Sequence, residues 1–203
     1  MSTWIYFLLV LLTMTAWCVL HSYLAALSTK QLVRRFTSQR VDRFYRLAFV
    51  GIAVGTLLPV LGLVARAPAV TLWTIPMPWR IISLSIQGLA LIGLILAVLQ
   101  TDGLAFVGLR QVIETSQPPA ESLVTDGFYR FVRHPFYFFS LIIFWLFPIM
   151  TNLTMAFFLV ATLYFFIGSI LEERKLIKVY GAAYQTYRQE VPRIIPRFPR
   201  RRR

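Results

Sequence analysis

The sequence is poor in the residues that build metal sites and covalent cross-links. It has one cysteine, Cys18, and two histidines, His21 and His134, among 203 residues. One cysteine excludes a disulfide within the chain and any multi-cysteine metal site. Two histidines are too few for a histidine-rich metal site, so we expect no bound metal. Cys18 stands in an apolar run, where it is best interpreted as a small buried hydrophobe.

Acidic residues are scarce as well, since eight Asp and Glu oppose 21 Lys and Arg and leave a net charge of +13. Such an excess can indicate nucleic-acid binding, but no basic stretch here is interleaved with aromatics on a soluble domain, and we expect no nucleic-acid partner. Hydrophobic residues make up 58% of the chain, above the roughly 45–50% of soluble domains. The sequence therefore indicates a membrane protein, whose basic loops face anionic lipid head groups.

Four apolar runs approach the roughly 20 residues that a membrane-spanning helix needs. They cover about 4–27, 47–65, 81–99 and 153–171, and a shorter run covers 136–149. Pro148, Thr151 and Asn152 separate the last two runs, which predicts a tight helical hairpin. The first run is too long for the core of a signal peptide and has no positive leader, so we expect it to be retained. The predicted fold class is an all-α integral membrane protein with about five transmembrane helices, followed by a cytoplasmic C-terminal helix and tail.

Lysine and arginine alternate in number from loop to loop. The first loop has six, the second two, the third three, the hairpin turn none and the tail from residue 172 onward ten. By the positive-inside rule, the N-terminus lies outside and the C-terminus lies in the cytoplasm. Residues 1–105 then hold the first three helices and a basic cytoplasmic loop, whereas residues 106–203 hold the hairpin, the polar motifs and a basic tail. The candidate functional residues all fall on the cytoplasmic side.

His134 is the first candidate. It stands between Arg133 and Pro135 at the start of a membrane helix, where Pro135 fits the first turn. Free backbone N–H groups and the helix dipole make this place suitable for a carboxylate. The alternative interpretation is a polar cap, with Arg133 facing lipid phosphates.

Glu172 and Glu173, at the end of the last apolar run, are the second candidate, because carboxylates at membrane depth usually mark a functional site or an ion pair. The alternative is a salt bridge with Arg174 or Lys175. The hairpin should bring His134 and Glu172 close together. An apolar stripe predicts that the last helix continues into the cytoplasm; it comprises Leu176, Tyr180, Tyr184, Tyr187 and Val191.

Three further features have an ordinary interpretation as well as a functional one. Tyr129 and Tyr137 flank the Arg-His-Pro motif, but interfacial tyrosines are also common membrane anchors. His21 either faces the same site or forms a hydrogen bond inside the helix bundle. Taken together, the residues predict a cytoplasm-facing pocket with a histidine, a carboxylate and tyrosines, which suits a zwitterionic small molecule.

The same residues resemble a known family. The motifs are residues 123–129 (LVTDGFY), 132–137 (VRHPFY), the glutamate pair 172–173, and Tyr180-Gly181, Tyr184, Tyr187, Val191-Pro192 and Ile195-Pro196. With their spacing they resemble the membrane methyltransferases typified by isoprenylcysteine carboxyl methyltransferase. Additional motifs are similar to the branch of methanethiol S-methyltransferases and NnrU proteins; they are His21-Ser22, Tyr45-Arg46, residues 108–112 (GLRQV), Phe144-Trp145 and residues 148–151 (PIMT).

The resemblance implies an enzyme that uses S-adenosylmethionine as methyl donor without a Gly-rich nucleotide loop, and the sequence contains no such loop. It implies a methyltransferase-like cofactor-binding region in residues 106–203. By position, the cofactor-binding residues would be Gln111, Ser122, Leu123, Val124, Tyr129, His134, Pro135, Tyr137 and Glu172, with His134 and Glu172 in catalytic roles. We assign the methionyl carboxylate to His134 and the ammonium or a ribose hydroxyl to Glu172.

The methyl acceptor is predicted to be small or apolar. The prenylcysteine enzymes carry an arginine four residues before the first glutamate, and this chain has Gly168 there. A thiol, as in methanethiol S-methyltransferases, therefore fits better than a prenylcysteine, with a lipid as a further alternative; the acceptor would reach the site from the bilayer. The competing function is a non-catalytic, NnrU-like accessory membrane protein.

Overall fold

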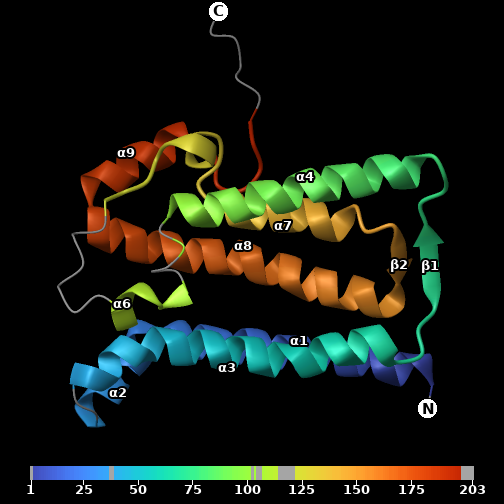
Figure 1. Ribbon diagram of the computed structural model, residues 1–203, viewed down its shortest axis with the longest axis horizontal. Coiled ribbons are helices and arrows are strands. Elements are labelled where there is room, and N and C mark those ends of the chain that lie inside the picture. The colour runs from blue at the N-terminus through green and yellow to red at the C-terminus, as the bar shows by residue number, and fades with distance from the viewer. Residues whose placement is uncertain (1, 37–38, 102, 104–106, 114–121, 198–203) are drawn as a thin grey trace, which may run out of the picture. The chain divides into compact units, whose positions relative to one another are not determined.

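The computed structural model describes residues 2–36, 39–101, 103, 107–113 and 122–197, and it is predominantly helical (Figure 1). In chain order the elements are α1 (Thr3–Ala25), α2 (Leu27–Phe36), α3 (Gln39–Arg66), β1 (Thr71–Thr74), α4 (Trp79–Gln100), α6 (Arg110–Ile113), the 3-10 helix η1 (Gly127–Arg130), α7 (Pro135–Trp145), β2 (Ile149–Thr151), α8 (Asn152–Tyr180) and α9 (Ala182–Glu190).

Four of these helices are long and apolar enough to cross a membrane: α1, the Phe44–Arg66 part of α3, α4 and α8. They match the four long runs predicted from the sequence. The fifth predicted helix is α7, which is apolar but has only 11 residues. Large hydrophobic side chains cover the outside of the long helices, as expected of surfaces that face lipid. The chain is an integral membrane protein of the all-α class, and one short pair of strands occurs among its described residues.

The described chain divides into two compact units. The first unit contains α1, α2, α3, α6, the two strands and the beginning of α8. Within it α1 and α3 lie side by side (Figure 1). The indole N–H of Trp17 donates to the Ala53 carbonyl at 2.9 Å, and the Tyr45 hydroxyl donates to the Leu24 carbonyl at 2.6 Å. These two bonds fix α3 against α1 at separate levels.

The connection between α7 and α8 is a strand, which the sequence analysis did not anticipate. We expected the apolar run 136–149 to be helical to its end, but α7 stops at Trp145. Residues Ile149–Thr151 instead form β2, which pairs antiparallel with β1. Asn152 extends this pairing, because its N–H donates to the Val70 carbonyl and its side-chain oxygen accepts from the Val70 N–H, both at 2.9 Å. The pairing partner lies about 80 residues away in the chain, so local turn residues could not reveal it.

The second unit contains α4, η1, α7, the rest of α8 and α9. Small residues of α4 let α7 approach closely, as is common between membrane helices. Ala90, Gly93 and Ala97 are buried on one face of α4, and a Cβ placed on Gly93 would lie 2.5 Å from the ring of Phe139 on α7. The Ser83 hydroxyl also donates to the Leu146 carbonyl at the other end of α7. This packing holds α7, and therefore the residues at its N-terminus, in place.

The last helix continues beyond the apolar run, as predicted, but it is not continuous through Val191. Helix α8 ends at Tyr180, and Gly181 adopts a positive φ of 56°, a conformation that glycine tolerates best. The chain then starts the separate helix α9, whose Tyr184 and Tyr187 are buried. After the break, the Tyr187 hydroxyl donates to the Tyr129 carbonyl in η1, and the rings of Tyr184 and Tyr187 contact each other.

Candidate functional site

Backbone hydrogen bonds fix the motif around His134. His134 is the N-cap residue of α7 and Pro135 is the first residue of that helix, as the missing N–H of proline favours. The N–H of Arg133 donates to the Pro192 carbonyl at 2.9 Å, and the N–H of His134 donates to the Arg193 carbonyl at 3.0 Å. The segment that follows α9 therefore runs along the motif and holds it at the end of α7.

A buried ion cluster lies behind this segment. Glu173 accepts hydrogen bonds from Arg133 Nε at 2.9 Å, from Arg133 Nη2 at 2.7 Å and from Arg193 Nε at 3.2 Å. The Glu173 and Arg133 side chains are only 3% and 7% exposed. Arg133 Nη1 also donates to the carbonyls of Arg188, at 2.8 Å, and of Val191. Buried charges require this kind of pairing, so the cluster connects α7, α8 and the segment after α9.

The cluster shows the partners of Arg133 and Glu173, for which the sequence left alternatives open. Arg133 does not face lipid phosphates but is buried against Glu173. The carboxylate of Glu173 does pair with arginine, but with Arg133 and Arg193 rather than with its neighbours Arg174 or Lys175. Sequence reasoning did not identify this arrangement, and the position of Arg133 directly before His134 was the only signal that could have suggested it.

Glu172 has a different environment from Glu173. Its side chain is 49% exposed, and it accepts a hydrogen bond from the Tyr137 hydroxyl at 3.1 Å. Oε2 of Glu172 also lies 3.4 Å from Nδ1 of His134, which confirms the predicted proximity of the two residues. One carboxylate of the pair is therefore buried in the ion cluster, and the other is oriented by two neighbours and accessible from outside.

The imidazole of His134 lies between the two carboxylates. Its Nδ1 is 3.4 Å from Glu172 and its Nε2 is 3.4 Å from Glu173, and its side chain is only 6% exposed. Burial opposes the charged form, but the two neighbouring carboxylates outweigh burial and raise the pKa of His134 above its ordinary value. His134 is therefore favoured as an imidazolium ion that holds Glu172 in position.

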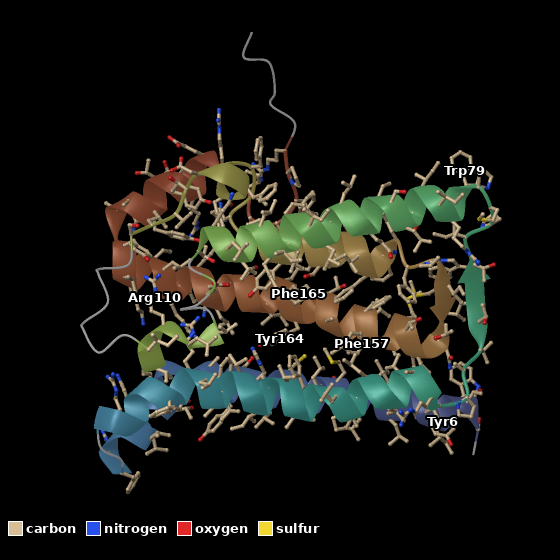
Figure 2. The ribbon with its side chains drawn as sticks, viewed as in Figure 1. Tyr6, Trp79, Arg110, Phe157, Tyr164 and Phe165 are labelled. Atoms are coloured by element: carbon tan, nitrogen blue, oxygen red, sulfur yellow. The ribbon has the colours of Figure 1, made fainter. Side chains whose placement is uncertain are left out.

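A series of stacked aromatic rings extends from His134 along α7 and α8. The rings of His134 and Tyr137 stack at a centroid distance of 5.3 Å, those of Tyr137 and Phe165 at 4.9 Å, and those of Phe165 and Phe144 at 5.9 Å. Each pair is within 15° of parallel. Figure 2 shows Phe165 on α8. This column connects the polar end of the site to the apolar middle of the second unit.

Tyr129 joins the site from η1. Its backbone carbonyl accepts from the Tyr187 hydroxyl at 2.5 Å, and its own hydroxyl interacts with Thr101 at the end of α4. Burial is the main cause that raises its pKa, and the charge of Glu172 adds to the effect. Gly127 is the first residue of η1 and has a φ of 59°. A Cβ on this residue would lie 2.1 Å from the Gln100 side chain. The side-chain oxygen of Gln100 accepts a hydrogen bond from the Phe128 N–H.

The remaining predicted residues are placed as follows. Pro135 is buried at the start of α7, and Ser122, Leu123 and Val124 lie before η1 in a segment without regular secondary structure, in which Ser122 is exposed. Gln111 lies in α6 of the first unit, and its side chain is outside the described residues. His21 also belongs to the first unit, where its ring packs against Trp17 at 4.9 Å and Phe49 at 4.8 Å.

The fold and the site define a helical membrane protein with an accessible carboxylate where a short apolar helix begins. A family model described as phospholipid methyltransferase matches residues 84–183, which include His134, Tyr137 and both glutamates. No solved structure matches the chain.

Several proteins of known activity are similar in sequence. Methanethiol S-methyltransferase 1 of Bradyrhizobium diazoefficiens is 31% identical over 92% of this chain and 65% of its own length. The methanethiol S-methyltransferase of Crocosphaera subtropica is 32% identical over 63% of this chain and 51% of its own length. The protein-S-isoprenylcysteine O-methyltransferase of Schizosaccharomyces pombe is 31% identical over 54% of each chain. The match thus spans about half to two thirds of the length of these relatives. The chain is therefore similar in sequence to membrane methyltransferases, among them methanethiol S-methyltransferases and a protein-S-isoprenylcysteine O-methyltransferase.

Proposed function

We propose that this protein is a membrane-embedded methyltransferase that uses S-adenosylmethionine as donor and methylates a small or apolar acceptor, a thiol in the first place. The observation that carries the proposal is the accessible carboxylate of Glu172, held by Tyr137 and His134 inside the segment that matches the methyltransferase family. Residues 106–203 would form the cofactor-binding region. Methanethiol S-methyltransferases among the similar proteins support the choice of acceptor.

The site fits the polar end of this donor through Glu172 rather than through His134. Both imidazole nitrogens of His134 already face carboxylates, which leaves them poorly placed to hold a further anion. The Glu172 carboxylate is half exposed and anionic, so it suits an ammonium group or ribose hydroxyls. We therefore assign donor contact to Glu172 and Tyr137, and the positioning of Glu172 to His134. Ser122, Leu123, Val124, Tyr129, Pro135 and Gln111 stay candidates for the rest of the donor.

S-adenosylmethionine would supply a methyl group on a positively charged sulfonium, and the transfer forms a bond from the acceptor sulfur to that methyl as the methyl–sulfonium bond breaks. The chain would contribute orientation and exclusion of water. Tyr137 and His134 fix the carboxylate, and the rings of Tyr137 and Phe165, which stack beside it, would limit the access of water on that side. A thiolate is itself a strong nucleophile, so a dedicated general base is unnecessary once the acceptor has lost its proton to the solvent.

Gly168 supports a small acceptor that has no carboxylate. A Cβ placed on Gly168 would lie 3.7 Å from the Tyr137 hydroxyl, and Gly168 precedes Glu172 by one helical turn. Gly168 therefore borders the space beside Tyr137 without contributing a side chain. It offers no cation that could bind the carboxylate of an acceptor. By the positive-inside rule, we place the N-terminus outside and both the C-terminus and the site in the cytoplasm.

The test is binding of S-adenosylhomocysteine to the full-length protein in detergent, measured by calorimetry. Glu172→Gln should weaken binding about 10-fold to 100-fold, because a hydrogen bond to a charged group contributes about 1.5–3 kcal/mol. Glu190→Gln, which neutralises an exposed carboxylate on α9, is the matched control and should bind as the unchanged protein does.

Three results would contradict parts of the proposal. Equal affinity in Glu172→Gln would remove Glu172 from the site. Absence of binding to folded, unchanged protein would contradict the cofactor assignment and favour an accessory protein. Binding without methylation of methanethiol or longer thiols would exclude the thiol acceptor and direct the search to lipids and prenylcysteines.

A further inference from the structure

Helix α2 turns away from the membrane-spanning helix that precedes it. Ala26 ends α1 with an extended conformation, φ −70° and ψ 140°, and its N–H donates to the Tyr23 carbonyl. The Thr29 hydroxyl donates to the same carbonyl at 2.6 Å, and Thr29 is buried. Figure 1 shows α2 turned from the axes of α1 and α3, at the end of the pair opposite β1. The turn is thus fixed by specific bonds, and α2 begins where a membrane-spanning helix ends.

The sequence of α2 is strongly two-sided. At 100° per residue, Leu32 and Phe36 lie above one another on one face. Lys30 and Arg34 form the opposite pair, and Arg35 flanks the apolar face. Helix α1 and the Phe44–Arg66 part of α3 are apolar, whereas α2 combines an apolar face with a basic one.

The apolar face of α2 is only partly covered by protein. Its inner edge packs on α1 and α3, where Thr29 is buried. Its outer edge is open, since Leu32 is 46% exposed and Phe36 is 82% exposed. An exposed phenylalanine four residues from an exposed leucine, flanked by basic residues at the end of a membrane span, matches the composition of helices that lie in a membrane interface.

We propose that α2 lies along the surface of an anionic lipid leaflet. Phe36 and Leu32 would insert at the boundary between head groups and acyl chains, and Lys30, Arg34 and Arg35 would contact lipid phosphates. Charge complementarity selects this occupant over a second copy of the chain, because two copies of α2 would bring like charges together. The inference concerns the first unit and is independent of the proposed methyltransferase activity.

The test places a fluorophore on α2 in the full-length protein. Cys18→Ala removes the only cysteine, and Leu32→Cys then accepts an environment-sensitive label while Phe36 is retained. Gln31→Cys is the matched control, since Gln31 is the exposed neighbour on the basic side. Both proteins are reconstituted in vesicles of phosphatidylcholine and phosphatidylglycerol, with part of the lipid brominated on its acyl chains. Brominated lipid should quench the label at position 32 roughly twofold more, or better, than the label at position 31. Iodide should quench the label at position 31 more strongly than the label at position 32.

The lipid charge is tested separately with the label at 32. Arg34→Gln combined with Arg35→Gln, or vesicles of phosphatidylcholine alone, should reduce the quenching by brominated lipid, whereas Arg66→Gln at the end of α3 should leave it unchanged. Iodide quenching at 32 equal to that at 31 would show α2 in water and overturn the proposal. Protection of the label at 32 from both quenchers would show a protein partner and overturn it as well. Quenching by brominated lipid that is unaffected by lipid charge would overturn the recognition of anionic lipid.

Discussion

The buried carboxylate of Glu173 should hold the C-terminal segment in place. Glu173→Gln keeps the size of the side chain but removes its charge, which leaves the buried guanidinium of Arg133 with a neutral partner. The hydrogen bonds from Arg133 and Arg193 would lose their ionic character, and the amide can accept on only one atom. Because Arg133 also donates to the carbonyls of Arg188 and Val191, a shift of its side chain loosens the segment that follows α9.

The size of the effect follows from burial. Removing one member of a buried ion pair destabilises a protein by about 3–5 kcal/mol. We take the lower figure, since the Arg193 side chain is 37% exposed and can rehydrate, and since Arg133 retains its two carbonyl partners. A loss of about 3 kcal/mol in the closed state of the segment increases the population of its open state roughly 100-fold.

Limited proteolysis with trypsin measures that opening. The rate of cleavage after Arg188, an exposed residue of α9, follows the open population when the segment closes faster than the protease cuts. Glu173→Gln should increase this rate about 100-fold. Glu172→Gln is the matched control; because the half-exposed carboxylate of Glu172 contributes only about 0–1 kcal/mol, its rate should change by no more than about fivefold. Equal rates in the two variants would refute the reasoning.

Two other predictions follow from the second unit, both measured by thermal unfolding in detergent. An imidazole whose pKa is raised by folding stabilises the protein fully below its ordinary pKa of about 6.5 and loses that effect as the pH rises through the raised value. Stability should therefore fall as the pH rises above about 6.5, and His134→Gln should flatten that slope; an unchanged slope would exclude the histidine as its source. Gly93→Ala should cost about 1–3 kcal/mol, because its methyl group would meet the ring of Phe139. Gly88→Ala, with open space around it, should leave stability unchanged or raise it by up to about 1 kcal/mol; equal losses in both variants would contradict the packing explanation.

The membrane-spanning helices could be predicted because they depend on local hydropathy. The contact between His134 and Glu172 could be predicted because it depends on the order of the helices in the chain. Lipid requires long apolar helices, so hydropathy alone located α1, α3, α4 and α8. The proximity of His134 and Glu172 followed from the order of the last two helices, since an antiparallel pair brings the start of one near the end of the other. These predictions did not need any side-chain geometry.

Most of the features that could not be predicted are contacts between residues that lie far apart in the sequence. The bond from Arg133 to Glu173 joins residues 40 apart, and Arg193 reaches the cluster from beyond α9. The pairing of β1 with β2 is longer still, and neither strand has the length or alternation that makes strands recognisable. The break at Gly181 was missed for a different reason: the apolar stripe continues across it, and the stripe alone cannot distinguish one helix from two.

The two adjacent glutamates show why residue type alone could not assign the roles. Consecutive residues on an α-helix point about 100° apart, so Glu172 and Glu173 must face different surroundings. Glu173 faces Arg133 and the segment after α9, where its charge is neutralised and removed from water. Glu172 faces Tyr137 and the outside. His134 touches both carboxylates, and it therefore links the buried ion cluster to the accessible carboxylate: loosening of the cluster at Glu173 should also disturb the orientation of Glu172. A protein that binds a cationic ligand at Glu172 thus depends on Glu173 without contact between Glu173 and that ligand.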